Sequence, residues 1–174
     1  ELDGIPLAIE LAAARVKLLS VEQIAERLGQ RFKLLRGGQK SAPTRQQTLL
    51  AAIDWSYDQL DAAEKAALRR LCVFGSGFTL GAAEAVCAGE YAEHATPGDL
   101  NEDSVLEEWE VIDLVGQLLD KSLLFVDETH GDAGSGEPRY RMLVTVRQFG
   151  FLKLSDADES AEAITRHLSW MVEL

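Results

Sequence analysis

The order of helical and strand-like segments along the chain constrains its fold more than any other feature. Apolar residues at helical spacing predict consecutive helices, and two short strand-like segments with a Gly- and Asp-rich turn between them come afterwards. The helices are expected over about 45–57, 61–74, 80–88 and 111–119, and the strands over 122–126 and 139–142. Helices followed by a β-hairpin are the order of a winged helix-turn-helix. The predicted fold class is therefore mainly α: a helical piece, then a winged-helix domain whose wing is a β-hairpin.

Further helices are expected on both sides of this core. Pro6 opens a strongly apolar first helix, predicted to reach Leu19 and to be buried on several sides. Ser20 with Gln23 matches a capping box and predicts the start of a second helix, as Asp61 with Glu64 does later in the chain. Two more helices are expected over 144–154 and from residue 160 onward.

Charge is distributed unevenly along the chain. Residues 89–137 hold fourteen Asp and Glu against one Lys, whereas residues 1–75 have a net charge of +2, and the whole chain has a net charge of −12. An acidic stretch repels nucleic acid and suits solvent or a basic protein partner. Two basic pairs, Arg69 with Arg70 and Arg139 with Arg141, are expected to meet that acidic stretch or solvent rather than phosphate.

The chain lacks the motifs that mark common catalytic sites. It has no phosphate-binding loop, no HExxH and no GxSxG, and its three histidines are widely separated. Cys72 and Cys87 lie in apolar helical contexts, which favours buried thiols in a reducing cytoplasm over a disulfide or a metal site. We therefore expect no catalytic residue, no metal and no cofactor in this chain, and no membrane association, because no apolar run approaches the roughly 20 residues that span a bilayer.

An ordered set of motifs resembles a known family across nearly the whole chain. Gly4 to Arg15 reads GIPLAIELAAAR, which is similar to the GLPLAIELAAAR segment of bacterial STAND-class NTPases, the NB-ARC-like ATPases of LuxR- and AfsR-type regulators. The resemblance continues, in the family's order, through 47–49, 54–60, 73–74 with 77–80, 119–123, 140–143 and 146–149. It implies a helical subdomain piece over 1–38, a winged-helix domain over 42–155 with an acidic insertion at 89–108, and the start of downstream helical sensor repeats over 156–174.

The resemblance also implies two nucleotide-related sites in a longer parent protein. In the family the GxP turn, here Gly4, Ile5, Pro6 and Leu7, packs against the adenine of ATP or ADP bound with Mg²⁺; Pro6 as a mere helix starter is the alternative. A Met-His-Asp triplet follows the wing in many relatives. The matching positions are Met142, Leu143 and Val144, which offer neither a charge nor a side-chain hydrogen-bond donor, so this sensor position is degenerate.

The resemblance implies a regulatory function. In this hypothesis the winged helix is a nucleotide-dependent switch that contacts the parent's upstream nucleotide-binding domain and downstream helical repeats and controls self-association. The alternative is a DNA-binding transcriptional regulator, because winged helices often read the major groove. The expected recognition helix, over 107–121, holds five acidic residues against one Lys, and DNA binding relies on Lys and Arg, so direct DNA binding is not favoured.

Overall fold

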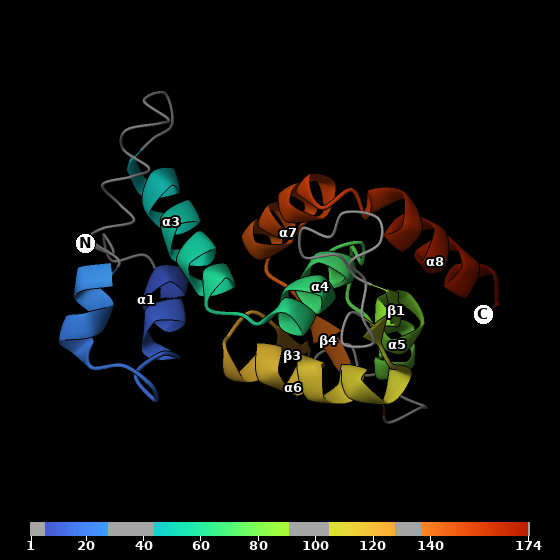
Figure 1. Ribbon diagram of the computed structural model, residues 1–174, viewed down its shortest axis with the longest axis horizontal. Coiled ribbons are helices and arrows are strands. Elements are labelled where there is room, and N and C mark those ends of the chain that lie inside the picture. Colours follow the sequence, from blue (N-terminus) through green and yellow to red (C-terminus); the bar gives the residue numbers. More distant parts are fainter. Residues whose placement is uncertain (1–5, 28–43, 91–104, 128–136, 174) are drawn as a thin grey trace. The chain divides into compact units, whose positions relative to one another are not determined.

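The computed structural model describes residues 6–27, 44–90, 105–127 and 137–173 (Figure 1). The chain divides into two compact units, Glu1–Leu60 with Asp120–Ser122, and Asp61–Leu119 with Leu123–Leu174. The predicted winged-helix domain begins at residue 42, whereas the division between the units comes at Leu60, so the helix before it belongs to the first unit.

The first unit is a small cluster of helices. It contains α1 (Pro6–Ala13), a helical segment over 21–27, and α3 (Thr44–Asp58), which packs on α1. Its core joins Ala12, Ile24 and Trp55. The capping box at Ser20 is confirmed, because the Gln23 backbone N–H donates to the Ser20 hydroxyl at 3.3 Å and the Ser20 N–H donates to the Gln23 side chain at 3.0 Å.

The first helix is shorter and more exposed than its sequence predicts. It ends at Ala13, and residues 14–18 form turns in which the Arg15 and Val16 N–H groups bond three residues back. Leu11 is fully buried, but Leu18 is exposed, so the prediction of a helix buried on several sides to residue 19 is wrong for the described residues. Leu11 and Ala12 are buried, and Ala12 joins a core cluster with Trp55 of α3, whereas Ile9 is exposed.

The second unit begins with the helices of the winged helix. Asp61 caps α4 with a complete capping box, in which the Glu64 N–H donates to the Asp61 carboxylate at 2.8 Å. Thr79 caps the next helix by accepting from the Ala82 N–H at 3.3 Å. The helices are α4 (Ala62–Leu71), α5 (Leu80–Cys87), the 3-10 turn η2 (Glu108–Glu110) and α6 (Val111–Asp120). A short antiparallel pair, β1 (Gly89–Glu90) with β2 (Val105–Leu106), joins the two ends of the predicted acidic insertion; residues 91–104 lie outside the described residues.

The wing is an antiparallel hairpin of β3 (Phe125–Asp127) and β4 (Arg139–Arg141). Phe78, between α4 and α5, exchanges backbone hydrogen bonds of 2.9 and 2.8 Å with Tyr140, which adds a third strand position to the hairpin. The predicted strand starts three residues too early. Ser122 adopts a φ of 57° and the Leu123 and Leu124 N–H groups both bond to the Leu118 carbonyl, so this segment closes α6 before extended backbone begins.

Two helices complete the second unit. Helix α7 (Val144–Asp156) packs on α4, and α8 (Ser160–Glu173) packs on α5. Cys72 at the end of α4, Leu154 of α7 and Ala163 of α8 form a buried cluster, and Met142 packs against this cluster. The mainly helical fold with a β-hairpin wing is confirmed. No helix in the described part of the chain is long and apolar enough to cross a membrane.

Candidate functional site

Helix α6 is the position at which a winged helix presents its recognition surface, and its two faces differ sharply. Its inner face is buried in the second unit through Val111, Leu114, Val115 and Leu118. The outer face, together with η2, leaves Trp109 69% exposed and Ile112 53% exposed. Two large apolar side chains are therefore turned away from the core of the second unit.

Acidic side chains surround these two apolar residues. The exposed residues include Glu107, Glu108 and Asp113, and the sequence over 107–120 holds no Lys or Arg. Glu107 and Glu110 are linked by a capping box, in which the Glu107 N–H donates to the Glu110 carboxylate at 2.9 Å. This bond fixes the turn that holds Trp109 outward.

A hollow of about 580 Å³ lies beside Trp109. It is lined by the β1 and β2 ends and by three glutamates, and none of the described residues that line it is basic. The lining residues are Glu84, Ala88, Gly89, Val105, Leu106, Glu107, Glu108 and Trp109. An aromatic ring beside several carboxylates favours a cationic group and disfavours phosphate.

The arginines of the wing are engaged within the second unit. Arg141 forms an ion pair of 3.1 Å with Asp127 across the hairpin, which confirms the expectation that it meets the acidic stretch. Arg139 donates instead to the Gly77 carbonyl at 3.3 Å. Both contacts hold these side chains against the hairpin rather than extending them toward a nucleic acid.

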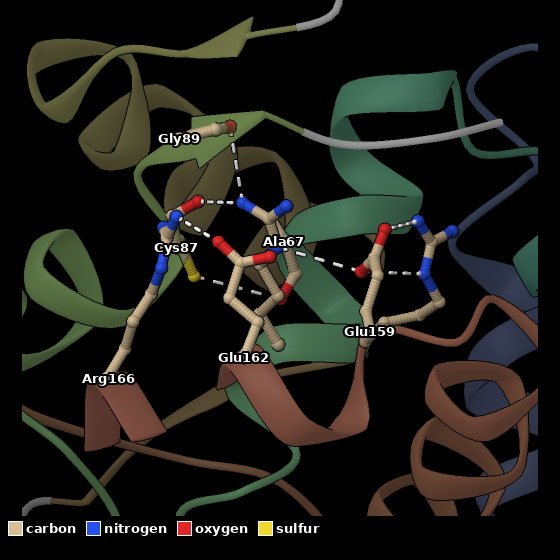
Figure 2. A network of polar contacts seen from close by, with 8 residues as sticks. Ala67, Cys87, Gly89, Glu159, Glu162 and Arg166 are labelled. Carbon is tan, nitrogen blue, oxygen red and sulfur yellow. Dashed lines mark hydrogen bonds and ion pairs between the residues drawn. The ribbon is translucent and has the colours of Figure 1, made fainter. Parts of the chain in front are cut away.

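The first basic pair lies in the core, where sequence reasoning did not expect it. Arg69 and Arg70 are buried in α4, and both meet Glu159, which is also buried, at 2.8 and 3.6 Å (Figure 2). Glu159 precedes α8 and lies outside the acidic stretch. The prediction that this pair meets solvent or the acidic stretch is therefore wrong, because the junction of α7 and α8 supplies a buried counter-charge.

The same network reaches the start of β1 (Figure 2). Arg70 donates to the carbonyls of Cys87 and Gly89, and burial lowers the pKa of its guanidinium. On α8, Glu162 pairs with Arg166 one turn along the helix. These contacts connect α4, the end of α5 and α8.

Both cysteines are buried thiols, as expected. Burial raises the pKa of Cys72 and of Cys87 to about 12, so that both remain protonated near neutral pH. Such thiols have little nucleophilic character. Among the described residues, no group of three or more His, Cys, Asp or Glu is arranged to hold a metal ion.

The nucleotide-related positions fall on different units. Pro6 is exposed and starts α1; Gly4 and Ile5 lie outside the described residues, as does the Leu7 side chain. The degenerate sensor positions lie at the start of α7, where Met142 is half-buried against the cluster of Cys72, and Leu143 and Val144 are exposed. Their roles in nucleotide binding stay predictions.

Sequence reasoning missed the exposure of Trp109 and the burial of Glu159. A Trp flanked by glutamates at the start of an amphipathic helix is a signal that could have indicated the first. For Glu159 the local sequence offers no signal, because its partners Arg69 and Arg70 lie about ninety residues earlier in the chain.

The structure thus has a winged-helix-like domain in which α6 and η2 expose acidic side chains together with Trp109 and Ile112. The chain is similar to a protein of Mycobacterium tuberculosis named "Putative HTH-type transcriptional regulator", at 43% identity over 173 residues, which is 99% of this chain and 17% of that protein. It is also similar to an uncharacterized protein of Mycobacterium bovis, at 38% identity over 166 residues, which is 95% of this chain and 38% of that protein. The chain thus spans well under half the length of these curated relatives. No family model and no solved structure matches it.

Proposed function

We propose that this chain is the winged-helix regulatory module of a larger bacterial transcriptional regulator, and that its winged helix works through contacts with protein rather than with DNA. The name of the Mycobacterium tuberculosis relative supports the regulatory role. The chain matches only 17% of that relative, which leaves ample length for a separate DNA-contacting domain.

The charge of the recognition surface is the observation that supports this proposal. A protein bound to DNA neutralises phosphates with Lys and Arg, and its affinity falls steeply when those residues are missing. The α6 surface presents Glu107, Glu108 and Asp113, while Arg139 and Arg141 of the wing are engaged by Gly77 and Asp127. A duplex approaching this face would meet like charge.

Gel mobility-shift assays with random duplex DNA at low salt test the proposal, because low salt exaggerates electrostatic attraction. We expect no retention at micromolar protein. The matched variants are Arg139→Ala on the wing and Arg147→Ala on α7. Salt-sensitive retention that Arg139→Ala abolishes and Arg147→Ala leaves intact would refute the protein-contact proposal.

Direct DNA binding is the second candidate, and the relative's name is the observation that favours it. It requires Arg139 and Arg141 to leave their present partners and face the duplex. The mobility-shift assay therefore decides between the two candidates.

A nucleotide-dependent switch remains part of the proposal for the longer parent, and it is supported by the family resemblance alone. In that mechanism the exposed Pro6 at the start of α1 contacts adenine within a nucleotide-binding domain, and we propose no catalytic role for the residues of this chain. Titrating ADP into the longer protein and its Pro6→Ala variant tests this part: equal affinities would make Pro6 a helix starter only.

A further inference from the structure

Two large apolar side chains, Trp109 and Ile112, are more than half exposed on η2 and α6. Trp109, Ile112, Asp113 and Gly116 recur at the spacing of one helical face, and we call these four residues with Glu108 the α6 face. We propose that the α6 face binds a basic amphipathic helix of a protein partner. This inference rests on the proposed function, and it specifies the chemistry of the partner.

The apolar part of the face is shaped to receive a helix. Trp109 and Ile112 are both more than half exposed, and Trp is among the residues most enriched at binding hot spots. Gly116 follows one turn after Ile112, and a Cβ added there would meet nothing within 4 Å. No side chain therefore projects from the helix at this position, which leaves room for the backbone of a partner. Amphipathic helices bind through apolar anchors at three- and four-residue spacing, which matches such a strip.

The charge around the strip indicates that the incoming helix is basic. Glu84, Glu107 and Glu108 line the hollow beside Trp109, and its lining contains neither Lys nor Arg among the residues that the structure describes. An arginine side chain suits both features, because its guanidinium stacks on an indole ring and donates hydrogen bonds to carboxylates. The exposed carboxylates of Glu107, Glu108 and Asp113 also attract a basic partner before contact and so increase the association rate.

Alternative occupants fit the face less well. Duplex DNA is repelled by the same carboxylates. A second copy of the chain would bring two acidic faces together if it paired the same surface with itself, and like charges across an interface oppose association. A basic helix is the occupant that satisfies both the apolar and the charged parts of the face.

Binding of a synthetic probe to the full chain tests this inference. The probe is a fluorescein-labelled amphipathic peptide of arginine and leucine; its controls are a scrambled peptide of the same composition and one with glutamate in place of arginine. Fluorescence anisotropy should show binding of the amphipathic probe, weaker binding of the scrambled peptide and none of the glutamate peptide. Amide chemical-shift changes should centre on η2 and α6.

Matched variants separate the α6 face from general attraction to an acidic protein. Trp109→Ala and Ile112→Ala should each weaken the probe on the order of ten-fold, because each removes an apolar anchor without changing charge. Ile164→Ala removes an equally apolar, exposed side chain from α8 and should leave affinity within about two-fold. Asp113→Asn should weaken binding, whereas Asp156→Asn at the end of α7 should not.

Three outcomes overturn the inference. The first is equal affinity for the amphipathic and the scrambled peptides. The second is unchanged probe affinity in Trp109→Ala and Ile112→Ala variants whose circular dichroism matches that of the parent chain. The third is concentration-dependent self-association of the chain that either variant abolishes. None of these involves DNA, so the inference can fail while the mobility-shift result still supports a protein-contacting module. DNA retention would instead remove the proposed function itself.

Discussion

Glu159 is the buried counter-charge of two arginines in the interior of the second unit. Its side chain is 8% exposed, and its two partners, the side chains of Arg69 and Arg70, are 5% and 3% exposed. Charges removed from water are costly unless they are paired and hydrogen-bonded. Glu159 also lies directly before α8, where a negative charge favours the helix N-terminus.

Glu159→Gln should therefore destabilise the chain by about 3 kcal/mol. This magnitude is at the lower end for a broken buried ion pair, because Arg70 keeps its hydrogen bonds to the Cys87 and Gly89 carbonyls. Urea unfolding followed by circular dichroism measures the change. Glu162→Gln is the matched control. It breaks a more exposed pair one helical turn away and should cost about 0.3–0.5 kcal/mol. Equal effects of the two variants would mean that burial of the Glu159 network contributes nothing.

At the scale of elements, close packing of α7 on α4 depends on a glycine. A Cβ added to Gly150 would lie 2.9 Å from the Cβ of Cys72 and 3.6 Å from the Leu68 carbonyl. Gly150 is buried in the interior of α7, where its low helix propensity would otherwise be a disadvantage. The absent side chain lets the two helices approach.

Two helical glycines give opposite predictions. Gly150→Ala should destabilise the chain by roughly 1–3 kcal/mol, because α7 must move away from α4. Gly116→Ala in α6 enters open space and should stabilise it by about 0.5–1 kcal/mol through helix propensity alone. Thermal unfolding of the two variants and of the parent chain measures whether each substitution lowers or raises the stability. Stabilisation by Gly150→Ala would contradict the close approach of the two helices.

The same elements show what sequence patterns can predict. Capping boxes at Ser20 and Asp61, and the start of α5 at Leu80, follow from local rules and are found where expected. The first helix and the strand after α6 are misplaced, because their ends depend on contacts with α3 and on a left-handed residue at Ser122. No local sequence pattern predicts the ion pairs of Arg69 and Arg70 with Glu159, because these residues are distant in the chain.

At the candidate site, the sequence predicts the acidic charge but not the exposure of the apolar side chains. The acidic character of α6 is readable from the sequence, whereas the outward position of Trp109 depends on which face of the helix the core takes. The apolar spacing of Val111, Ile112, Val115, Leu118 and Leu119 predicts an amphipathic helix, and Val111, Val115 and Leu118 are buried as that pattern requires. The pattern also includes Ile112, which is 53% exposed, and it does not indicate that the capping box of Glu107 and Glu110 starts η2 with Trp109 exposed.

At the scale of the whole molecule, like charge opposes folding. The net charge is −12, and fourteen of the acidic residues lie within 89–137. A large net charge destabilises a compact state through self-repulsion, and salt screens that repulsion between exposed charges. The buried contacts of Glu159 are screened much less.

The free energy of unfolding should therefore rise with salt, by about 1 kcal/mol between low ionic strength and 0.5 M sodium chloride. Urea is the denaturant of choice because it adds no ions. Asp113→Asn removes one exposed charge from the crowded stretch and should reduce the salt dependence, whereas Glu159→Gln should lower stability at every salt concentration by a similar amount. A stability that falls as sodium chloride is added would mean that favourable surface ion pairs outweigh the repulsion. In that case the acidic stretch would already be neutralised within the chain, and its attraction for a basic helix at the α6 face would be correspondingly weaker.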